Sequence, residues 1–338
     1  MASLTDRSPK LDRDRLVRDL VPPPRFDGER FSTYRPDPAE PSQAAAVQRL
    51  EEYAAGLAGV GNGNGNGKGL FGRRRKRAQA GRGIYLDGGF GVGKTHLLAS
   101  LWHAASGPKS FGTFVEYTNL VGALGFAQTV EALSGHQLVC IDEFELDDPG
   151  DTVLMATLLA RLTEAGVSLA ATSNTLPDAL GEGRFAAEDF LREIQALASR
   201  FDVVTVDGPD YRHRDSLESP PPLDEAEVHS ATEREGAVLD HFVDVTRHLS
   251  TVHPSRYRAM LDGVTAVGWT HVRAVTDQAV ALRLVVLADR LYDEDIPVFA
   301  SGLPLGEIFS PEMLAGGYRK KYFRAVSRLT ALARGDDR

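Results

Sequence analysis

The sequence contains very little cysteine and no long apolar run. Cys140 is the only cysteine among 338 residues, so no disulfide can form within the chain, and a reducing, cytoplasmic compartment is the simplest expectation. Because Cys140 lies in an apolar run, we expect it to pack rather than to react. No stretch approaches the roughly 18 apolar residues of a membrane-spanning helix, and the first 25 residues hold no apolar core of signal-peptide length. Any membrane contact is therefore expected to be peripheral, without a transmembrane segment.

A general excess of basic residues is also missing. Acidic residues outnumber basic ones by 47 to 38, which leaves a formal net charge of −9, so nucleic acid is not an expected partner. One local exception is the basic cluster Arg73 to Arg77, which follows the Gly/Asn-rich residues 60–68. Such a segment buries too little apolar surface to offset its ordering entropy. Residues 59–82 are therefore predicted to be a flexible insert, whose arginines either touch phosphates or an acidic partner or are simply solvated.

The length predicts two domains. Residues 1–58 are expected to form an N-terminal extension that ends in a packing helix starting near Pro41, with Ala44, Val47, Leu50 and Tyr53 on one apolar face. Residues 83–214 are predicted to be the main domain, residues 215–230, rich in proline and acids, a linker, and residues 231–338 a smaller C-terminal α/β domain.

From Gly83 onward, short apolar runs alternate with longer helical patterns, which is typical of parallel strands joined by crossover helices. Strands are predicted at 83–87, 113–117, 137–142, 167–173 and 202–206, with helices near 93–105, 119–134, 151–165 and 187–199. The C-terminal part is predicted to be helical at 233–250 and 254–262. Residues 264–302 then repeat the strand-helix-strand pattern of residues 138–174, and duplication or the common rhythm of βαβ units explains this equally well.

One motif carries a specific chemistry. Residues 88–95 read Gly-Gly-Phe-Gly-Val-Gly-Lys-Thr, the pattern of a phosphate-binding P-loop between a strand and a helix. Glycines allow turns that aim backbone N–H groups at phosphates, and the helix start adds its positive partial charge. We therefore expect an ATP site made by Gly88, Gly89, Phe90, Gly91, Val92, Gly93, Lys94, Thr95 and His96. Lys94 is expected to reach the β- and γ-phosphates, and Thr95 to bind Mg²⁺.

Two carboxylates follow a hydrophobic strand in LVCIDE (138–143). Asp142 is the predicted magnesium ligand. Glu143 is the predicted general base, because a carboxylate beside the metal but not committed to it can deprotonate the attacking water.

Two further polar residues complete the predicted catalytic set. Asn174 ends the next strand and would lie between the P-loop strand and the acidic strand if a central strand is inserted there, where its amide could hold water or sense the γ-phosphate; a turn-forming role is the alternative. Arg200 precedes the last strand and is predicted to stabilise phosphoryl charge in the site of a neighbouring subunit. Arg192 and Arg184 are rivals for this role, and each arginine could instead form a plain salt bridge.

This succession of motifs resembles the ZapE family of bacterial cell-division ATPases, relatives of the mitochondrial AFG-type proteins within the AAA+-like class. The resemblance covers nearly the whole chain. Its most specific parts are the Asp142-Glu143-Phe144 triplet and the stretch from Asp210 to Arg214. It also rests on LFGRRRK (70–76), GVSLAATSNTLPDAL (166–180), RLYDEDIPVFASG (290–302) and FRAVSRLTAL (323–332).

The resemblance implies an α/β P-loop NTPase (AAA+-like) parallel sheet with flanking helices, ATP hydrolysis with Mg²⁺, an ATP-dependent homo-oligomer, and a cytoplasmic protein recruited to the division site. FtsZ or another division-ring component is the implied protein partner. Arg324 and Arg328 match the family's terminal arginine pair, and either could reach the nucleotide. The family usually carries arginine where this chain has Val92, and arginines expected around 186–189 are missing, so the identity of the trans-acting arginine stays open.

Two other functions fit the same residues. A nucleic-acid-associated ATP switch of the helicase-loader or replication-initiator type also pairs a P-loop with an arginine before the last strand, but such proteins usually add a basic recognition module. A nucleotide-dependent scaffold with negligible turnover is the third hypothesis, which the acidic pair disfavours.

Overall fold

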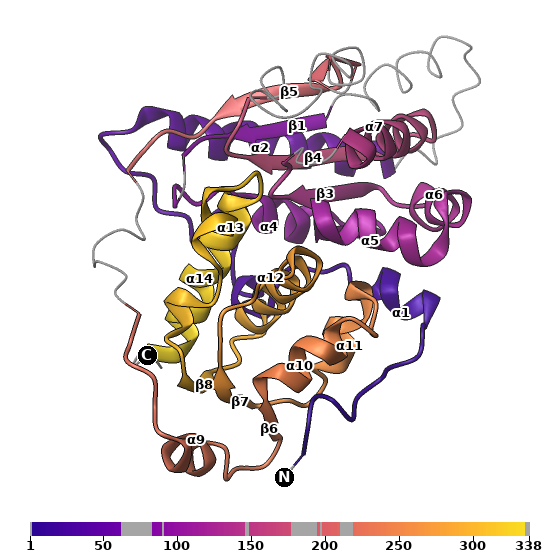
Figure 1. The fold of residues 1–338 in the computed structure, drawn as a ribbon. Helices are drawn as coiled ribbons and strands as arrows, with labels where there is room; N and C mark the ends of the chain where they lie inside the picture. The colour runs from indigo at the N-terminus through magenta and orange to yellow at the C-terminus, as the bar shows by residue number, and fades with distance from the viewer. Residues whose placement is uncertain are drawn as a thin grey trace, which may run out of the picture. The chain divides into compact units, whose positions relative to one another are not determined.

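The chain forms two compact units in the computed structural model, which describes residues 2–61, 83–89, 91–145, 149–176, 195–196, 198–209 and 219–334 (Figure 1). The larger unit comprises residues 12–22 and 26–214, and the C-terminal unit comprises residues 1–11, 23–25 and 215–338. The first residues of the chain thus belong to the same unit as the last. A short 3₁₀ helix, η1 (Pro24–Phe26), includes the point where the chain passes from the C-terminal unit to the larger unit.

The larger unit is built on a five-stranded parallel sheet. Its strands are β1 (Gly83–Asp87), β2 (Lys109–Thr113), β3 (Leu138–Asp142), β4 (Ser168–Ser173) and β5 (Phe201–Thr205). They lie in the order β2-β3-β4-β1-β5, and every neighbouring pair is parallel. The predicted α/β class and the predicted insertion of a central strand are therefore confirmed. All five residues of β3 are buried, as expected of a strand covered on both faces.

Helices pack on both faces of this sheet. They are α1 (Arg13–Arg18), α2 (Pro41–Gly61), α4 (Lys94–Ala104), α5 (Phe114–Leu124), α6 (Phe126–Ser134) and α7 (Pro149–Glu164). Alternate residues of β3 face opposite sides: Val139 and Ile141 join the core formed with α5, α6 and α7, whereas Leu138 and Cys140 join the core formed with α2 and α4. Burial raises the pKa of the Cys140 thiol well above its usual value, in line with a packing role.

Three details of the larger unit differ from the predicted elements. The strand expected at 113–117 lies at 109–113, because Thr113 and Glu116 form a capping box that starts α5. The helix expected at 119–134 is two helices, since Gly125 adopts φ 85° between them. Ala44 of α2 is exposed, and Ala46 and Leu50 are the fully buried positions of this helix. Most of the helix expected at 187–199 lies outside the described residues.

The C-terminal unit holds a second, three-stranded parallel sheet in the order β6-β7-β8. Its strands are β6 (Ala237–His241), β7 (Ala266–Val272) and β8 (Val298–Gly302), and its helical segments are α9 (Glu225–Ala231), α10 (Phe242–Leu249), η4 (Pro254–Arg256), α11 (Tyr257–Met260), α12 (Gln278–Asp293), η5 (Leu305–Glu307), α13 (Pro311–Ala315) and α14 (Arg319–Arg334). The single helix expected at 233–250 was wrong in its first half, since residues 237–241 form a strand with Ala237 and Val238 buried and the helix begins only at Phe242.

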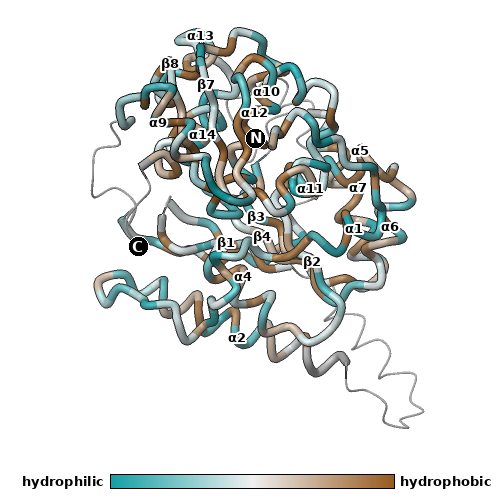
Figure 2. The backbone as a smooth tube through the Cα atoms, turned by 90° about the horizontal axis from the view of Figure 1, so that it is seen from below, coloured by the Kyte–Doolittle hydropathy of each residue, from teal (hydrophilic) through white to brown (hydrophobic). Residues whose placement is uncertain are grey.

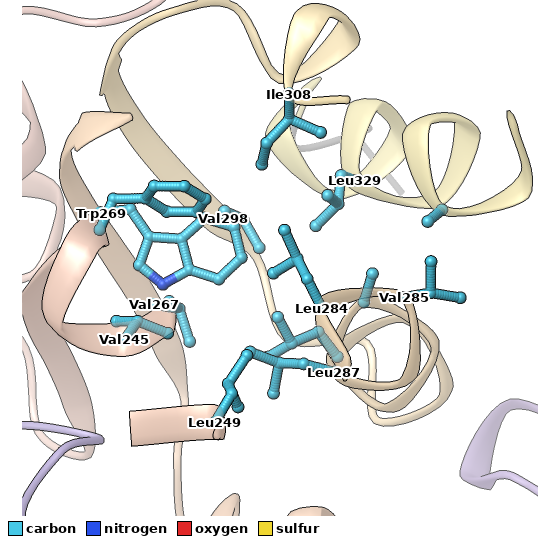
Figure 3. Close-up of a cluster of buried hydrophobic side chains, with 14 of the residues drawn as sticks. Val245, Leu249, Val267, Trp269, Leu284, Val285, Leu287, Val298, Ile308 and Leu329 are labelled. Atoms are coloured by element: carbon cyan, nitrogen blue, oxygen red, sulfur yellow. The ribbon is translucent and has the colours of Figure 1, made fainter. Parts of the chain in front are cut away.

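The core of this unit gathers around one tryptophan. Trp269 of β7 lies among Val298 of β8, Leu284 of α12 and Leu329 of α14 (Figure 3), and none of these four side chains has accessible surface. The predicted strand-helix-strand pattern of residues 264–302 is present as β7, α12 and β8. Along the helices of both units, polar and apolar residues alternate (Figure 2), as expected of helices that bury one face.

Candidate functional site

The loop between β1 and α4 requires glycine at both ends. An added Cβ would lie 2.1 Å from the carbonyl oxygen of Val206 at Gly88 and 2.6 Å from the ring of Tyr34 at Gly93. Gly91 and Gly93 have φ angles of 70° and 86°, in the left-handed region that glycine adopts without strain. Gly93 is the N-cap of α4, so the free backbone N–H groups of the helix start border this loop, as in phosphate sites. The predicted loop residue Phe90 lies outside the described residues.

Lys94 joins the loop to the end of β4. Its ammonium Nζ donates hydrogen bonds to the carbonyl oxygens of Gly88 (2.9 Å) and Gly89 and to Oδ1 of Asn174 (2.8 Å). The lysine is only 9% exposed, and a buried ammonium group requires such partners. Two residues that are 80 positions apart in the sequence are therefore in direct contact, beside the loop.

Asp142, at the end of β3, contacts the first turn of α4. The Thr95 hydroxyl lies 3.2 and 3.1 Å from the two carboxylate oxygens of Asp142, and the Thr172 hydroxyl also donates to Asp142. A hydroxyl and a carboxylate oxygen are ligands that Mg²⁺ accepts, usually together with substrate phosphates and water. Within the described ranges there is no cluster of three or more His, Cys, Asp or Glu residues able to hold a metal. Thr95 and Asp142 thus fit a magnesium ion that takes its remaining ligands from a nucleotide.

Glu143 adopts an unusual backbone conformation. Its φ is 52°, a left-handed value that is uncommon outside glycine and often marks functional sites. The conformation is held from both sides, because the N–H of Glu143 donates to the Thr172 hydroxyl (3.1 Å) and the N–H of Phe144 donates to the Thr172 carbonyl oxygen (2.7 Å). Phe144 is fully buried against Tyr85 and Phe114. The backbone at Glu143, directly after Asp142, is therefore held in one conformation by these contacts.

Thr172 is a site residue that the sequence reasoning missed. It binds both Asp142 and the backbone of Glu143 through one hydroxyl, and it is 2% exposed. The available signal was a buried polar residue within the apolar strand LAATS, since such a residue needs hydrogen-bond partners.

Arg200 lies at the amino ends of the strands, whereas the loop lies at their carboxyl ends. It directly precedes β5, and its carbonyl oxygen accepts from the N–H of Gly83, the first residue of β1 (2.7 Å), whereas the loop follows the last residue of β1. Five residues of strand separate these ends, or roughly 16 Å at 3.3 Å per residue. Within the described part of the chain, the Arg200 side chain makes no hydrogen bond or ion pair with the loop. The rivals Arg184 and Arg192 lie outside the described residues.

His96 contacts the segment before α2 rather than the loop. Its Nδ1 lies 3.3 Å from the Glu29 carboxylate, its Nε2 lies 3.0 Å from the Thr33 hydroxyl, and its ring meets the edge of Tyr34. No local sequence pattern predicts these contacts, because they join positions more than 60 residues apart.

A family model identifies the class of protein. The model described as AFG1-like ATPase matches residues 15–234 and 221–337. The chain belongs to the AFG1-like ATPase family. Membership in this ATPase family implies nucleotide binding.

Two curated relatives match part of this AFG1-like chain. The cell division protein ZapE of Escherichia coli (strain K12) is 32% identical over 145 residues, which is 39% of this chain and 39% of ZapE. An uncharacterized protein of Schizosaccharomyces pombe is 29% identical over 149 residues, 39% of this chain and 33% of that protein. The matched stretch thus spans well under half the length of either relative.

Solved structures give weaker matches. The structure of DnaI is 16% identical with a TM-score of 0.41 and covers 57% of this chain and 97% of that one. The DnaC helicase loader is 15% identical with a TM-score of 0.39, covering 54% of this chain and 99% of that one. Domain III of DnaA from Thermotoga maritima is 16% identical with a TM-score of 0.39, covering 68% and 76%.

The arginine pair near the end of this AFG1-like chain is engaged within the C-terminal unit. Arg324 Nη2 lies 3.0 Å from Asp289 Oδ2, and Arg328 pairs with the other carboxylate oxygen of Asp289. The Arg328 guanidinium also lies over the Tyr292 ring, 5.3 Å from its centroid. These contacts join α14 to α12.

Among the described helices, none is long and apolar enough to cross a membrane.

Proposed function

We propose that this chain binds ATP with Mg²⁺ and hydrolyses it. The observation that carries the proposal is the convergence of Lys94, Asp142 and Asn174, which contact the same loop and helix start although they follow three different strands. In parallel α/β sheets, ligands bind at the carboxyl ends of the strands. The side chains present there supply a cation, a carboxylate and an amide, the set that phosphoryl transfer uses.

Each residue has a distinct role in this proposal. Lys94 exchanges its loop carbonyl partners for phosphate oxygens, and Thr95 and Asp142 hold the magnesium ion, which neutralises charge on the phosphates. Glu143 takes the proton of the attacking water. Asn174, already in contact with Lys94, orients that water or senses the γ-phosphate.

The test is the Glu143→Gln variant. The amide keeps the shape of the side chain but cannot take a proton, so ATP binding should persist while turnover falls at least about 100-fold. The control is Glu164→Gln, because Glu164 is an exposed residue of α7 that pairs with Arg161, and this variant should hydrolyse ATP as the parent does. Unchanged hydrolysis by Glu143→Gln would remove the base assignment.

We further propose that the hydrolytic site is shared between subunits. Arg200 lies at the amino ends of the strands, remote from its own loop, so it can act on a nucleotide only from a neighbouring copy. An arginine supplied in this way stabilises charge on the transferring phosphoryl group. The proposal therefore includes an ATP-dependent homo-oligomer.

The partner is proposed to be a protein of the division ring, with FtsZ as the first candidate, at the division site in the cytoplasm. The similarity to a protein named for cell division supports this assignment. A pull-down with the Glu143→Gln variant held in ATP should retain the partner, because slow hydrolysis prolongs the bound state, and the Lys94→Ala variant should retain none. Binding of DNA with a steep salt dependence would instead favour a nucleic-acid-associated switch.

A further inference from the structure

The segment before α2, which is not part of the P-loop motif, contacts the phosphate loop through Tyr34. The hydroxyl of Tyr34 donates a hydrogen bond to the carbonyl oxygen of Val92 (2.9 Å). Its ring packs so closely on Gly93 that a Cβ there would lie 2.6 Å from the ring. Tyr34 therefore contacts two consecutive residues of the loop, one by a hydrogen bond and one by van der Waals contact.

This hydrogen bond orients the peptide group that joins Val92 to Gly93. In a planar trans peptide, the C=O of one residue and the N–H of the next point in opposite directions. Because the Val92 carbonyl is held toward Tyr34, the Gly93 N–H is directed away from Tyr34. Glycine at 93, with φ 86°, would otherwise allow this peptide to rotate.

A second contact holds the same region from the start of α2. Gln43 is 1% exposed; its amide oxygen accepts from the N–H of Asp37 (2.8 Å) and its amide nitrogen donates to the carbonyl oxygen of Asp207 (2.8 Å). Residues 206–208 in turn abut the loop, since a Cβ at Gly88 would lie 2.1 Å from the Val206 carbonyl oxygen. The segment before α2 is thus linked to both ends of the loop.

Val92 fits this packing. Its side chain is 2% exposed and belongs to the core that includes Ala46 and Leu50 of α2 and Val206. His96, in the first turn of α4, contacts the same segment through Glu29 and Thr33. The first turn of α4 and the loop before it therefore share one support.

We propose that Tyr34 is a positioning residue for the ATP site, which keeps the Gly93 N–H available to a phosphate oxygen by holding the Val92 carbonyl. The inference rests on the proposed function. It assigns to the N-terminal segment a part in nucleotide affinity rather than only in packing. Gln43 supports the same arrangement from the other side of the loop.

The test compares two tyrosine-to-phenylalanine variants in the full-length chain. Tyr34→Phe keeps the ring on Gly93 and removes only the hydroxyl. Tyr53→Phe is the matched control, because the Tyr53 hydroxyl also donates to a backbone carbonyl, that of Leu169 (3.0 Å), which lies near the start of β4, level with the first residues of β1 rather than with the loop. Each variant loses a hydrogen bond from a tyrosine hydroxyl to a backbone carbonyl oxygen, so both melting temperatures should fall.

The two variants should differ in nucleotide binding. Titration calorimetry with ADP in the absence of magnesium should show about fivefold weaker binding for Tyr34→Phe, the equivalent of one neutral hydrogen bond, and the parental Kd for Tyr53→Phe. In the ATPase assay, Tyr34→Phe should raise KM by a similar factor with kcat within about twofold of the parent.

Three results would overturn the inference. If the parent binds nucleotide and Tyr34→Phe has the same Kd, the inference fails and the proposed function stands. If the parent itself binds neither ADP nor ATP, the proposed function fails and the inference fails with it. A Kd loss shared equally by both variants would also overturn it, because the effect would then be one of general stability.

Discussion

Asp289 connects two helices of the C-terminal unit through two arginines, and its removal should destabilise that unit strongly. The carboxylate pairs with Arg324 and Arg328, and the three side chains are 16%, 22% and 12% exposed. Replacing Asp289 by Asn keeps the volume but removes the carboxylate charge that both guanidinium groups contact. Breaking a buried pair in this way typically costs about 3 to 5 kcal/mol, so we expect a loss of about 3 kcal/mol in the free energy of unfolding.

The assay can report on the C-terminal unit alone. The chain has two tryptophans: Trp269 lies in the core of the C-terminal unit, and Trp102 packs in the larger unit. In a Trp102→Phe background, urea unfolding followed by fluorescence therefore measures the C-terminal unit, which matters because two units need not unfold together. The control is Asp244→Asn, whose pair with Arg247 has side chains 50% and 72% exposed and should contribute less than about 0.5 kcal/mol.

The same pair predicts a dependence on pH. Burial alone would raise the pKa of the Asp289 carboxyl, but the guanidinium groups of Arg324 and Arg328 outweigh burial and hold the pKa below its usual value. A carboxyl with a depressed folded-state pKa stabilises the fold above its unfolded pKa of about 4, and this stabilisation is lost as the pH falls through the folded-state pKa. The difference between parent and Asp289→Asn should therefore shrink below about pH 4. A variant no less stable than Asp244→Asn at neutral pH would refute this reasoning.

Two further predictions concern the site. Gly88→Ala should abolish nucleotide binding, measured by calorimetry, because its Cβ would lie 2.1 Å from a backbone oxygen, whereas Gly135→Ala, at the end of α6, should bind as the parent does, since its Cβ would meet nothing within 4 Å; equal binding by both variants would contradict the steric argument. Mixing Arg200→Ala with Lys94→Ala subunits should restore part of the ATPase activity that each variant alone loses by about 100-fold or more, and assembled mixtures without any recovery would assign the trans role to another arginine.

The positions of most strands in the larger unit could be predicted because buried parallel strands are short, continuous apolar runs. The strand at 113–117 could not be placed this way, since Phe114 and Tyr117 suit a strand as well as the buried face of a helix. The capping box of Thr113 and Glu116 was present in the sequence as a helix-start signal, and it decides the outcome. The strand at 237–241 is hard to tell from a helix in the sequence, because it is only five residues long and is joined directly to α10 without a turn residue between them.

The site residues likewise fall into those that could be predicted from the sequence and those that could not. Lys94, Thr95 and Asp142 could be proposed as site residues because the P-loop and the acidic strand end each lie within a few consecutive residues, and the structure places Thr95 beside Asp142. Thr172 and Tyr34 could not, since their roles depend on contacts with residues 30 and 58 positions away. Such contacts can be identified only when the strand order and the helix packing are known, and no local sequence pattern predicts them.

The packing of Leu4 has a consequence for how the C-terminal unit folds. Leu4 is 1% exposed within the core of this unit, and its backbone N–H donates to Asp240 (2.9 Å), 236 positions away. Residues 215–338 alone therefore lack part of their own core, because residues 1–11 belong to the same unit. Bringing together segments that are so far apart in the sequence costs loop-closure entropy before any contact is gained, so the C-terminal unit should complete its core slowly.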